Sequence, residues 1–185
     1  MRLFVASSFE PGFAENLKAI AEYARANAEI GAVKWVEPGN FHLTYAFLGD
    51  LDQSAAAAAA KGIQAGLEGV KAFRISSGGF GVFPSSRRPS VLWVGIDEGA
   101  AELRGLAGKL AEGLAAAGLV FENRFEPHVT IGRVKSALPE NFIRRAAGFT
   151  QAKKAVSALS SVELMESVLT PSGPEYRTIR SMKLL

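Results

Sequence analysis

Apolar residues in the first part of the chain follow two different periods. Residues 2–6 and 33–36 form short apolar runs, which are typical of strands. Between these runs, apolar residues return every three or four positions, and a proline stands where a first helical turn would begin. This spacing predicts a helix over the segment that contains Pro11, Phe13, Leu17, Ile20 and Ala24.

The next two elements are predicted from a strand pattern followed by an alanine tract. Residues 41–48 form a third strand, which Gly49 and Asp50 end. Ser54 can cap a helix that runs through the six alanines at 55–60 to about Leu67. Because alanine favours helices more than any other residue, we interpret the tract as a helix surface and not as a linker.

The second half repeats this scheme of strands and helices. Strands at 72–76 and 91–96 flank a bend at Gly78-Gly79 and a polar turn at 84–89. A long helix follows, with Gly118 as its stop. Its apolar stripe consists of Leu103, Leu106, Leu110 and Leu114.

The last third predicts one strand, one short helix and a closing hairpin. The strand covers 129–134 and the helix 140–147. The hairpin consists of strands at 162–169 and 175–183, joined by the turn Pro171-Ser172-Gly173-Pro174. Helices and strands are both predicted, and they do not strictly alternate along the chain, which favours an α+β fold. No linker rich in proline, glycine or serine divides the chain. We therefore expect residues 1–185 to form a single domain.

Composition limits the chemistry more than it identifies it. The 185 residues include no cysteine, which excludes disulfides, thiolate metal sites and a cysteine nucleophile. The first apolar run is too short for a signal peptide or a membrane span, so we expect a cytoplasmic protein with no membrane contact. The net charge of +3 is too small for a broad nucleic-acid surface, but it allows a local basic pocket.

The chain has only two histidines, and both stand in the same tetrapeptide pattern. His42-Leu43-Thr44-Tyr45 and His128-Val129-Thr130-Ile131 each read histidine, apolar, threonine, apolar on a predicted strand. Strand alternation puts each histidine and its threonine on one face and the apolar residues on the other. The alternative is that each histidine only packs against a strand neighbour, and the repetition of residue types argues against it.

The separation of the two motifs, nearly half the chain, indicates two similar lobes. We expect antiparallel sheets that face each other across a central cleft, with helices outside and one motif in each lobe. Two imidazoles can then act as base and acid in one displacement, and the threonine hydroxyls can donate to phosphate oxygens. No carboxylate cluster accompanies either histidine, so we expect neither a metal nor another cofactor.

These motifs and their flanks resemble the 2H phosphoesterase superfamily, and within it the RNA 2′,3′-cyclic phosphodiesterases, also called 2′-5′ RNA ligases. The similar segments span nearly the whole chain. They are 34–44, 47–49, 79–84, 91–95, 125–133 and 167–169 with Gly173 and Tyr176. The resemblance implies a metal-free hydrolysis of an RNA-terminal 2′,3′-cyclic phosphate to a 2′-phosphate. It also implies reverse 2′-5′ RNA ligation, in which an RNA 5′-hydroxyl takes the place of water and tRNA half-molecules are joined through a 2′-5′ linkage.

For the site, the resemblance implies that His42 and His128 are catalytic and that Thr44 and Thr130 bind the phosphate. Arg133 occupies a ligand-binding position in the family, although its odd offset from His128 puts it on the opposite face of a regular strand. Phe47 is a candidate for stacking on a base, with packing in the core as the alternative. Trp35 is expected in the core, and Arg124 and the Arg87-Arg88 pair are expected as surface charges.

Two other functions stay open at this point. The same chemistry can act on a small cyclic nucleotide or a 2′-5′ oligoadenylate in place of an RNA end. A protein of a different class, an RNA-binding module that holds phosphate ends without cutting them, is disfavoured because both motifs are intact. The sequence leaves open which histidine is the acid, and we expect a monomer.

Overall fold

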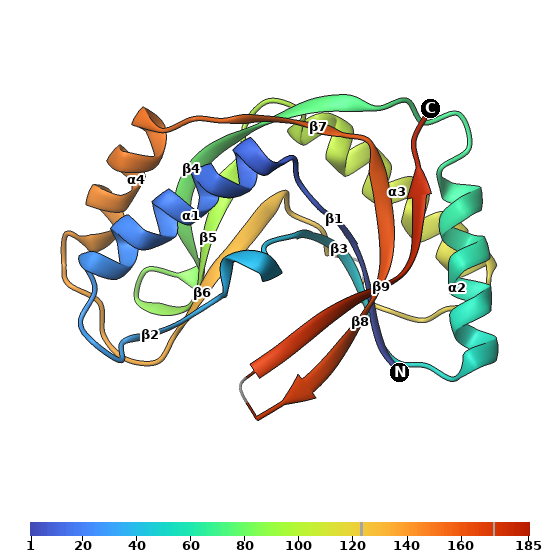
Figure 1. Ribbon diagram of the computed structural model, residues 1–185, viewed down its shortest axis with the longest axis horizontal. Coiled ribbons are helices and arrows are strands. Elements are labelled where there is room, and N and C mark those ends of the chain that lie inside the picture. The colour runs from blue at the N-terminus through green and yellow to red at the C-terminus, as the bar shows by residue number, and fades with distance from the viewer. Residues whose placement is uncertain (123, 172) are drawn as a thin grey trace.

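The computed structural model describes residues 1–122, 124–171 and 173–185 and confirms the predicted α+β class. Within them, one curled antiparallel sheet has the order β7-β4-β5-β6-β3-β1-β8-β9, and β2 pairs with β6 (Figure 1). The strands are β1 (Arg2–Ser7), β2 (Val33–Trp35), β3 (Leu43–Asp50), β4 (Phe73–Ser85), β5 (Arg88–Ile96), β6 (His128–Val134), β7 (Val156–Leu159), β8 (Ser161–Thr170) and β9 (Gly173–Lys183). The helices are α1 (Pro11–Ala26), η1 (Pro38–Asn40), α2 (Gln53–Gly66), α3 (Ala100–Ala116) and α4 (Phe142–Ala152).

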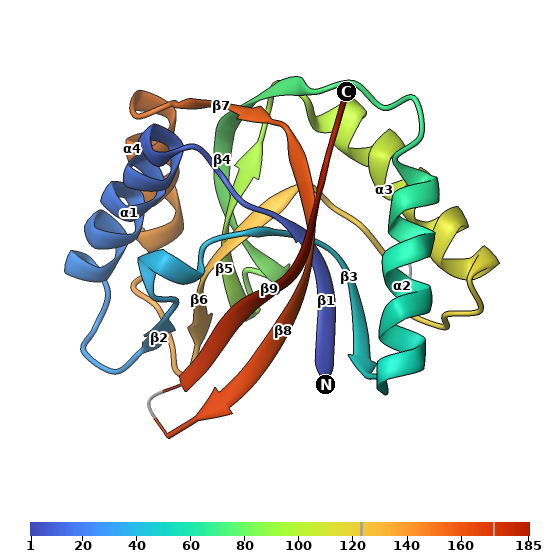
Figure 2. The same ribbon diagram turned by 45° about the vertical axis from the view of Figure 1, so that its right-hand side comes forward.

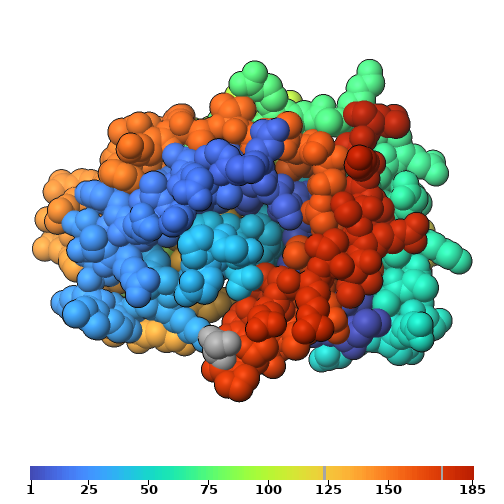
Figure 3. All heavy atoms as spheres, in the orientation of Figure 1, coloured from blue at the N-terminus to red at the C-terminus, as the bar shows by residue number. Residues whose placement is uncertain are grey.

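The helices form two pairs, and each pair combines one helix from either half of the chain. Helix α1 packs against α4 beside β4, β6 and β7, whereas α2 packs against α3 beside β3 and β8. Both ribbon views show these pairs at opposite ends of the sheet (Figures 1 and 2). The β8–β9 hairpin forms one edge of the sheet and lies next to the segment that contains η1 (Figure 3).

The predicted helices form, with two corrections at α2. Its N-cap is Asp52 and not Ser54, because the Asp52 carboxylate accepts a hydrogen bond of 2.8 Å from the backbone N–H of Ala55. The alanine tract is not only a surface, since Ala56, Ala59 and Ala60 are buried. At Gly113 of α3, an added Cβ would lie 2.2 Å from the Gly62 carbonyl oxygen, so the two helices meet backbone to backbone there.

The sheet departs from the prediction mainly in β4, β5 and β7. Strand β4 continues beyond the predicted 72–76 through the Gly78-Gly79 bend, where its pairing with β5 is irregular between Ser77 and Phe80. The polar turn shrinks because β5 begins at Arg88. The short strand β7 was not predicted, and α4 ends five residues later than expected. In the predicted closing turn, Ser172 lies outside the described residues.

Candidate active site

The two histidine motifs lie on neighbouring strands at the middle of the sheet. Strands β3 and β6 pair at Leu43 and Val129, and both of these side chains are fully buried. Antiparallel pairing around this bridge sets His42 across from Thr130 and Thr44 across from His128. The two motifs therefore form a square of two imidazoles and two hydroxyls with approximate two-fold symmetry, on the face opposite the core.

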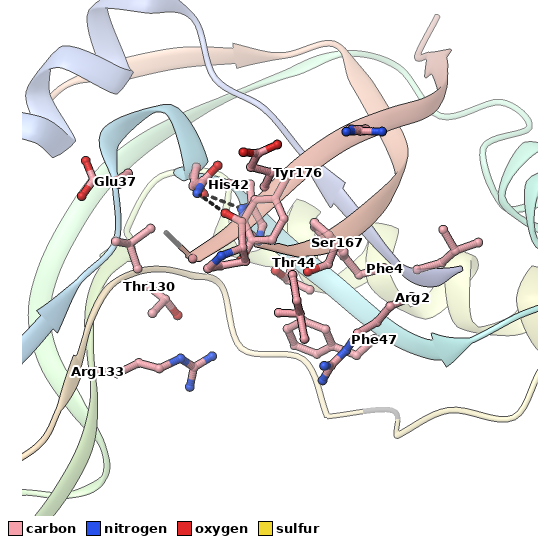
Figure 4. A pocket seen from close by; sticks show the side chains of 18 of the residues that line it. Arg2, Phe4, Glu37, His42, Thr44, Phe47, Thr130, Arg133, Ser167 and Tyr176 are labelled. Atoms are coloured by element: carbon pink, nitrogen blue, oxygen red, sulfur yellow. Dashed lines mark hydrogen bonds between the residues drawn. The ribbon is translucent and has the colours of Figure 1, made fainter. Parts of the chain in front are cut away.

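The square forms the floor of a cavity of about 880 Å³. All six predicted site residues line this cavity, since Arg133 and Phe47 join the four motif residues (Figure 4). The sheet strands supply the walls, and the β8–β9 hairpin closes one side. There, the Asn40 side-chain amide donates a hydrogen bond of 3.0 Å to the Pro174 carbonyl.

The same backbone contact orients both imidazoles. Nδ1 of His42 lies 2.7 Å from the Asn40 carbonyl oxygen, and Nδ1 of His128 lies 2.7 Å from that of Glu126. Because a carbonyl oxygen only accepts, Nδ1–H donates in each case and Nε2 is the nitrogen left for chemistry. A neutral imidazole held in this way presents a lone pair at Nε2, and a protonated one presents an N–H donor there.

Both histidines have a pKa below the ordinary value of 6.5. Burial lowers the pKa of His42, with the charge of His128 adding to the effect, and burial also lowers the pKa of His128. Aromatic rings cause much of this burial. Phe4 and Tyr176 each lie 5.0 Å from the His42 ring, and Phe83 lies 5.1 Å from the His128 ring, as measured between centroids.

A β-bulge in each motif strand turns the residue five positions after the histidine toward the cavity. In β3, Val5 and Ala6 pair with Ala46 and Thr44, so Tyr45 is an extra residue. Tyr45 and Ala46 are consequently both buried, and the alternation shifts so that Phe47 shares the face of Thr44. Without the bulge, Phe47 would point into the core.

Strand β6 has the equivalent bulge at the equivalent position. Leu92 and Trp93 of β5 pair with Gly132 and Thr130, which leaves Ile131 as the extra residue. This bulge turns Arg133 toward the cavity, despite the odd offset from His128 that argued against it. Phe47 and Arg133 therefore occupy matching positions, five residues after each histidine, and give the symmetric floor one aromatic wall and one cationic wall.

The cavity also contains residues to which the sequence assigned no role, namely the cations Arg2, Lys34 and Arg177, the aromatic ring of Phe4 and the hydroxyl of Ser167. Tyr176, which the resemblance already includes with the closing strands, lines the cavity as well. Lys34 lies directly across from Arg133 in the β2–β6 pair, and no ion pair among the described residues involves either side chain. Like charges opposite one another are unfavourable unless an anion lies between them.

Two other residues that the sequence singled out, Trp35 and Arg124, lie as follows. Trp35 lines the cavity and also packs against the core. Arg124 forms an exposed ion pair with Glu122, as expected for a surface charge. Among the described residues, no group of three or more His, Cys, Asp or Glu side chains could hold a metal, and no helix is long and apolar enough to cross a membrane.

Comparison with known proteins finds one family over most of the chain. A family model described as the 2′-5′ RNA ligase superfamily matches residues 11–167. An RNA 2′,3′-cyclic phosphodiesterase of Aquifex aeolicus is 34% identical over 173 residues, which cover 92% of this chain and 92% of that protein. The protein of the same name from Archaeoglobus fulgidus is 34% identical over 184 residues, which cover 97% and 98%.

Solved structures show the same similarity. A crystal structure of a Thermus thermophilus protein superposes with a TM-score of 0.75 at 25% identity, covering 100% of this chain and 98% of that chain. Escherichia coli LigT complexed with 3′-AMP superposes with a TM-score of 0.73 at 25% identity, covering 99% and 97%. By its sequence and by its fold, the chain belongs to the 2′-5′ RNA ligase superfamily.

Proposed function

We propose that this protein hydrolyses the 2′,3′-cyclic phosphate at an RNA end to a 2′-phosphate, with His42 and His128 as the acid–base pair. The observation that carries the proposal is the His-Thr square, in which both Nε2 atoms are left free for chemistry. Two similar proteins are named RNA 2′,3′-cyclic phosphodiesterases, and a third, LigT, has been crystallised with 3′-AMP. These names support the same substrate class for this chain.

The reaction follows from the symmetry of the square. One neutral imidazole takes a proton from water at Nε2 while the water oxygen bonds to phosphorus. The bond from phosphorus to O3′ breaks in line, and the second imidazole, protonated at Nε2, gives its proton to O3′. Since the two histidines are placed alike, either can serve as base, and they exchange roles when the reaction runs backward.

The hydroxyls and the cation hold the phosphate while its charge is redistributed. Thr44 and Thr130 donate to the nonbridging oxygens from the neighbouring strands β3 and β6, and Arg133 adds a charged donor from the end of β6. Phe47 stacks on the terminal base from the other wall. The protein residues supply every proton transfer in this scheme, so the reaction proceeds without a metal and in a monomer.

The same site also supports ligation. If an RNA 5′-hydroxyl takes the place of water, its oxygen bonds to phosphorus, O3′ leaves with a proton, and a 2′-5′ linkage results. RNA ends with a cyclic phosphate, such as those of tRNA fragments, are the substrates for both reactions. The second candidate function is hydrolysis of a small cyclic nucleotide or a 2′-5′ oligoadenylate, for which the square and Phe47 would suffice.

The test is turnover of 2′,3′-cyclic AMP in EDTA, with 2′-AMP and 3′-AMP resolved by chromatography. We expect 2′-AMP as the main product and no change when EDTA is present. The double variant His42→Ala/His128→Ala, purified in the same way, controls for a contaminating nuclease. Loss of turnover in EDTA that a divalent ion restores would overturn the metal-free mechanism, and binding without turnover would favour an RNA-binding module.

A further inference from the structure

Arg2 is a fixed cation of the cavity for which the reaction has no use. Its backbone is held in β1 between Asp50 of β3 on one side and the start of the β8 pairing on the other. Next to it, the backbone N–H of Leu51 donates a hydrogen bond of 2.8 Å to the Met1 carbonyl. The side chain lines the cavity and extends into it beside Phe47, from the wall opposite Arg133 (Figure 4).

The position of Arg2 along β1 separates it from the phosphate that reacts. Ala6 pairs with Thr44, and Arg2 lies four residues before Ala6 on the same strand. At about 3.3 Å per residue, this offset is about 13 Å. An arginine side chain is shorter than that, so the guanidinium meets a group that lies beyond the His-Thr square.

The charge of Arg2 is also not neutralised by the protein. Asp50 is its cross-strand partner, yet no ion pair among the described residues joins the two side chains. The fields of Arg133 and Arg2 both reach the Tyr176 hydroxyl, where they oppose the rise of its pKa that burial causes. Two carboxylates, Glu37 and Glu175, line the same cavity, but no ion pair among the described residues joins Arg2 to either of them. The exposed guanidinium is therefore open to an anion of a ligand in the cavity.

We propose that Arg2 binds the phosphodiester on the 5′ side of the terminal nucleotide and so makes the site selective for an RNA end over a cyclic mononucleotide. This inference rests on the proposed function, because it takes the cyclic phosphate to lie in the His-Thr square. The next anion along an RNA chain is that phosphodiester. A cyclic mononucleotide has an uncharged 5′-hydroxyl in its place, so it gains nothing from Arg2.

Binding separates this inference from the chemistry. We would titrate 3′-AMP and the dinucleotide ApAp, which ends in a 3′-phosphate, into the wild-type protein, Arg2→Gln and Arg145→Gln. Arg145 is an exposed arginine of α4 outside the cavity, so its variant loses the same charge elsewhere. ApAp should bind the wild type and Arg145→Gln about tenfold more tightly than 3′-AMP. Arg2→Gln should lose this preference and bind 3′-AMP within about twofold of wild type.

The salt dependence and the turnover of the cyclic forms complete the test. In the wild type, the plot of log affinity against log salt should be steeper for ApAp by about 0.7, the slope of one phosphate contact on a single strand, and Arg2→Gln should abolish the difference. Equal affinity of the wild type for both ligands, or an equal loss for both in Arg2→Gln, would overturn the inference. A further outcome is that the wild type prefers ApAp and yet hydrolyses neither 2′,3′-cyclic AMP nor ApA that ends in a 2′,3′-cyclic phosphate. In that case the proposed function fails and the phosphodiester subsite stands.

Discussion

Replacing Phe47 by alanine tests whether the aromatic wall holds the terminal base. The side chain is 68% exposed, so its removal should lower the free energy of unfolding by less than about 1 kcal/mol, a fraction of the value for a fully buried phenylalanine. Stacking on a base contributes about 1–3 kcal/mol, which corresponds to about 5- to 150-fold in affinity. Stacking is the same in the ground and transition states, so KM for 2′,3′-cyclic AMP should rise by that factor with kcat nearly unchanged.

The equivalent position on the other strand supplies the matched variant. Arg133→Gln removes a donor to the phosphate, where charge develops, so it should lower kcat as well as kcat/KM. Phe47→Trp keeps a stacking surface and should restore KM to near the wild-type value. The reasoning is refuted if Phe47→Ala leaves KM unchanged, or if it lowers kcat as Arg133→Gln does, provided that denaturant midpoints show both variants folded.

Three further results are expected. His42→Ala and His128→Ala should each reduce kcat by about 10²-fold or more in a steady-state assay. Valine at either motif threonine should reduce kcat by a smaller factor. A folded histidine variant with normal kcat would remove that residue from the mechanism. The folded-state pKa of both histidines lies below the unfolded value of 6.5, so the unfolded chain binds more protons and the free energy of unfolding should fall as pH drops below about 6.5. Denaturant titrations should show a smaller fall in the alanine variants. On α3, Gly113→Ala should destabilise by about 1–3 kcal/mol because its Cβ meets the Gly62 carbonyl, and Gly108→Ala, with open space, should stabilise by up to about 1 kcal/mol; equal midpoints would contradict this.

The sequence predicts the floor of the site better than its walls. Each threonine follows its histidine by two residues. Strand alternation holds over so short a distance and correctly puts the two side chains on one face. Phe47 and Arg133 lie beyond a bulge. The doublet Tyr45-Ala46 carries no sequence signal for the extra residue, and in Ile131-Gly132 the signal is a single glycine within a strand. Alternation alone therefore assigns both walls to the wrong face. The role of Arg133 was suggested by the resemblance to a family, and that of Phe47 by its aromatic ring.

Other parts of the site could not be predicted because they depend on contacts far apart in the chain. Arg2 and Arg177 come from the first and last strands, which reach the cavity only when β1, β8 and β9 pair in register. Strand β7 was not predictable for a related reason. Its four residues show only a weak alternation of apolar and polar side chains, and they form a strand by pairing with β4. In contrast, the long helices were predictable because their apolar stripes repeat over several turns.

The crossed pairing of the helices has a consequence for how the chain can be divided. Cutting it between α2 and β4 would separate α1 from α4, and α2 from α3, so each piece would expose a helix face that its partner normally covers. It would also place one imidazole on each piece, because β3 and β6 would then belong to different polypeptides. We expect neither piece to fold alone and both to reassemble when mixed. Recovered turnover would thus report directly on the docking of two halves, which suits this protein to use as a split enzyme.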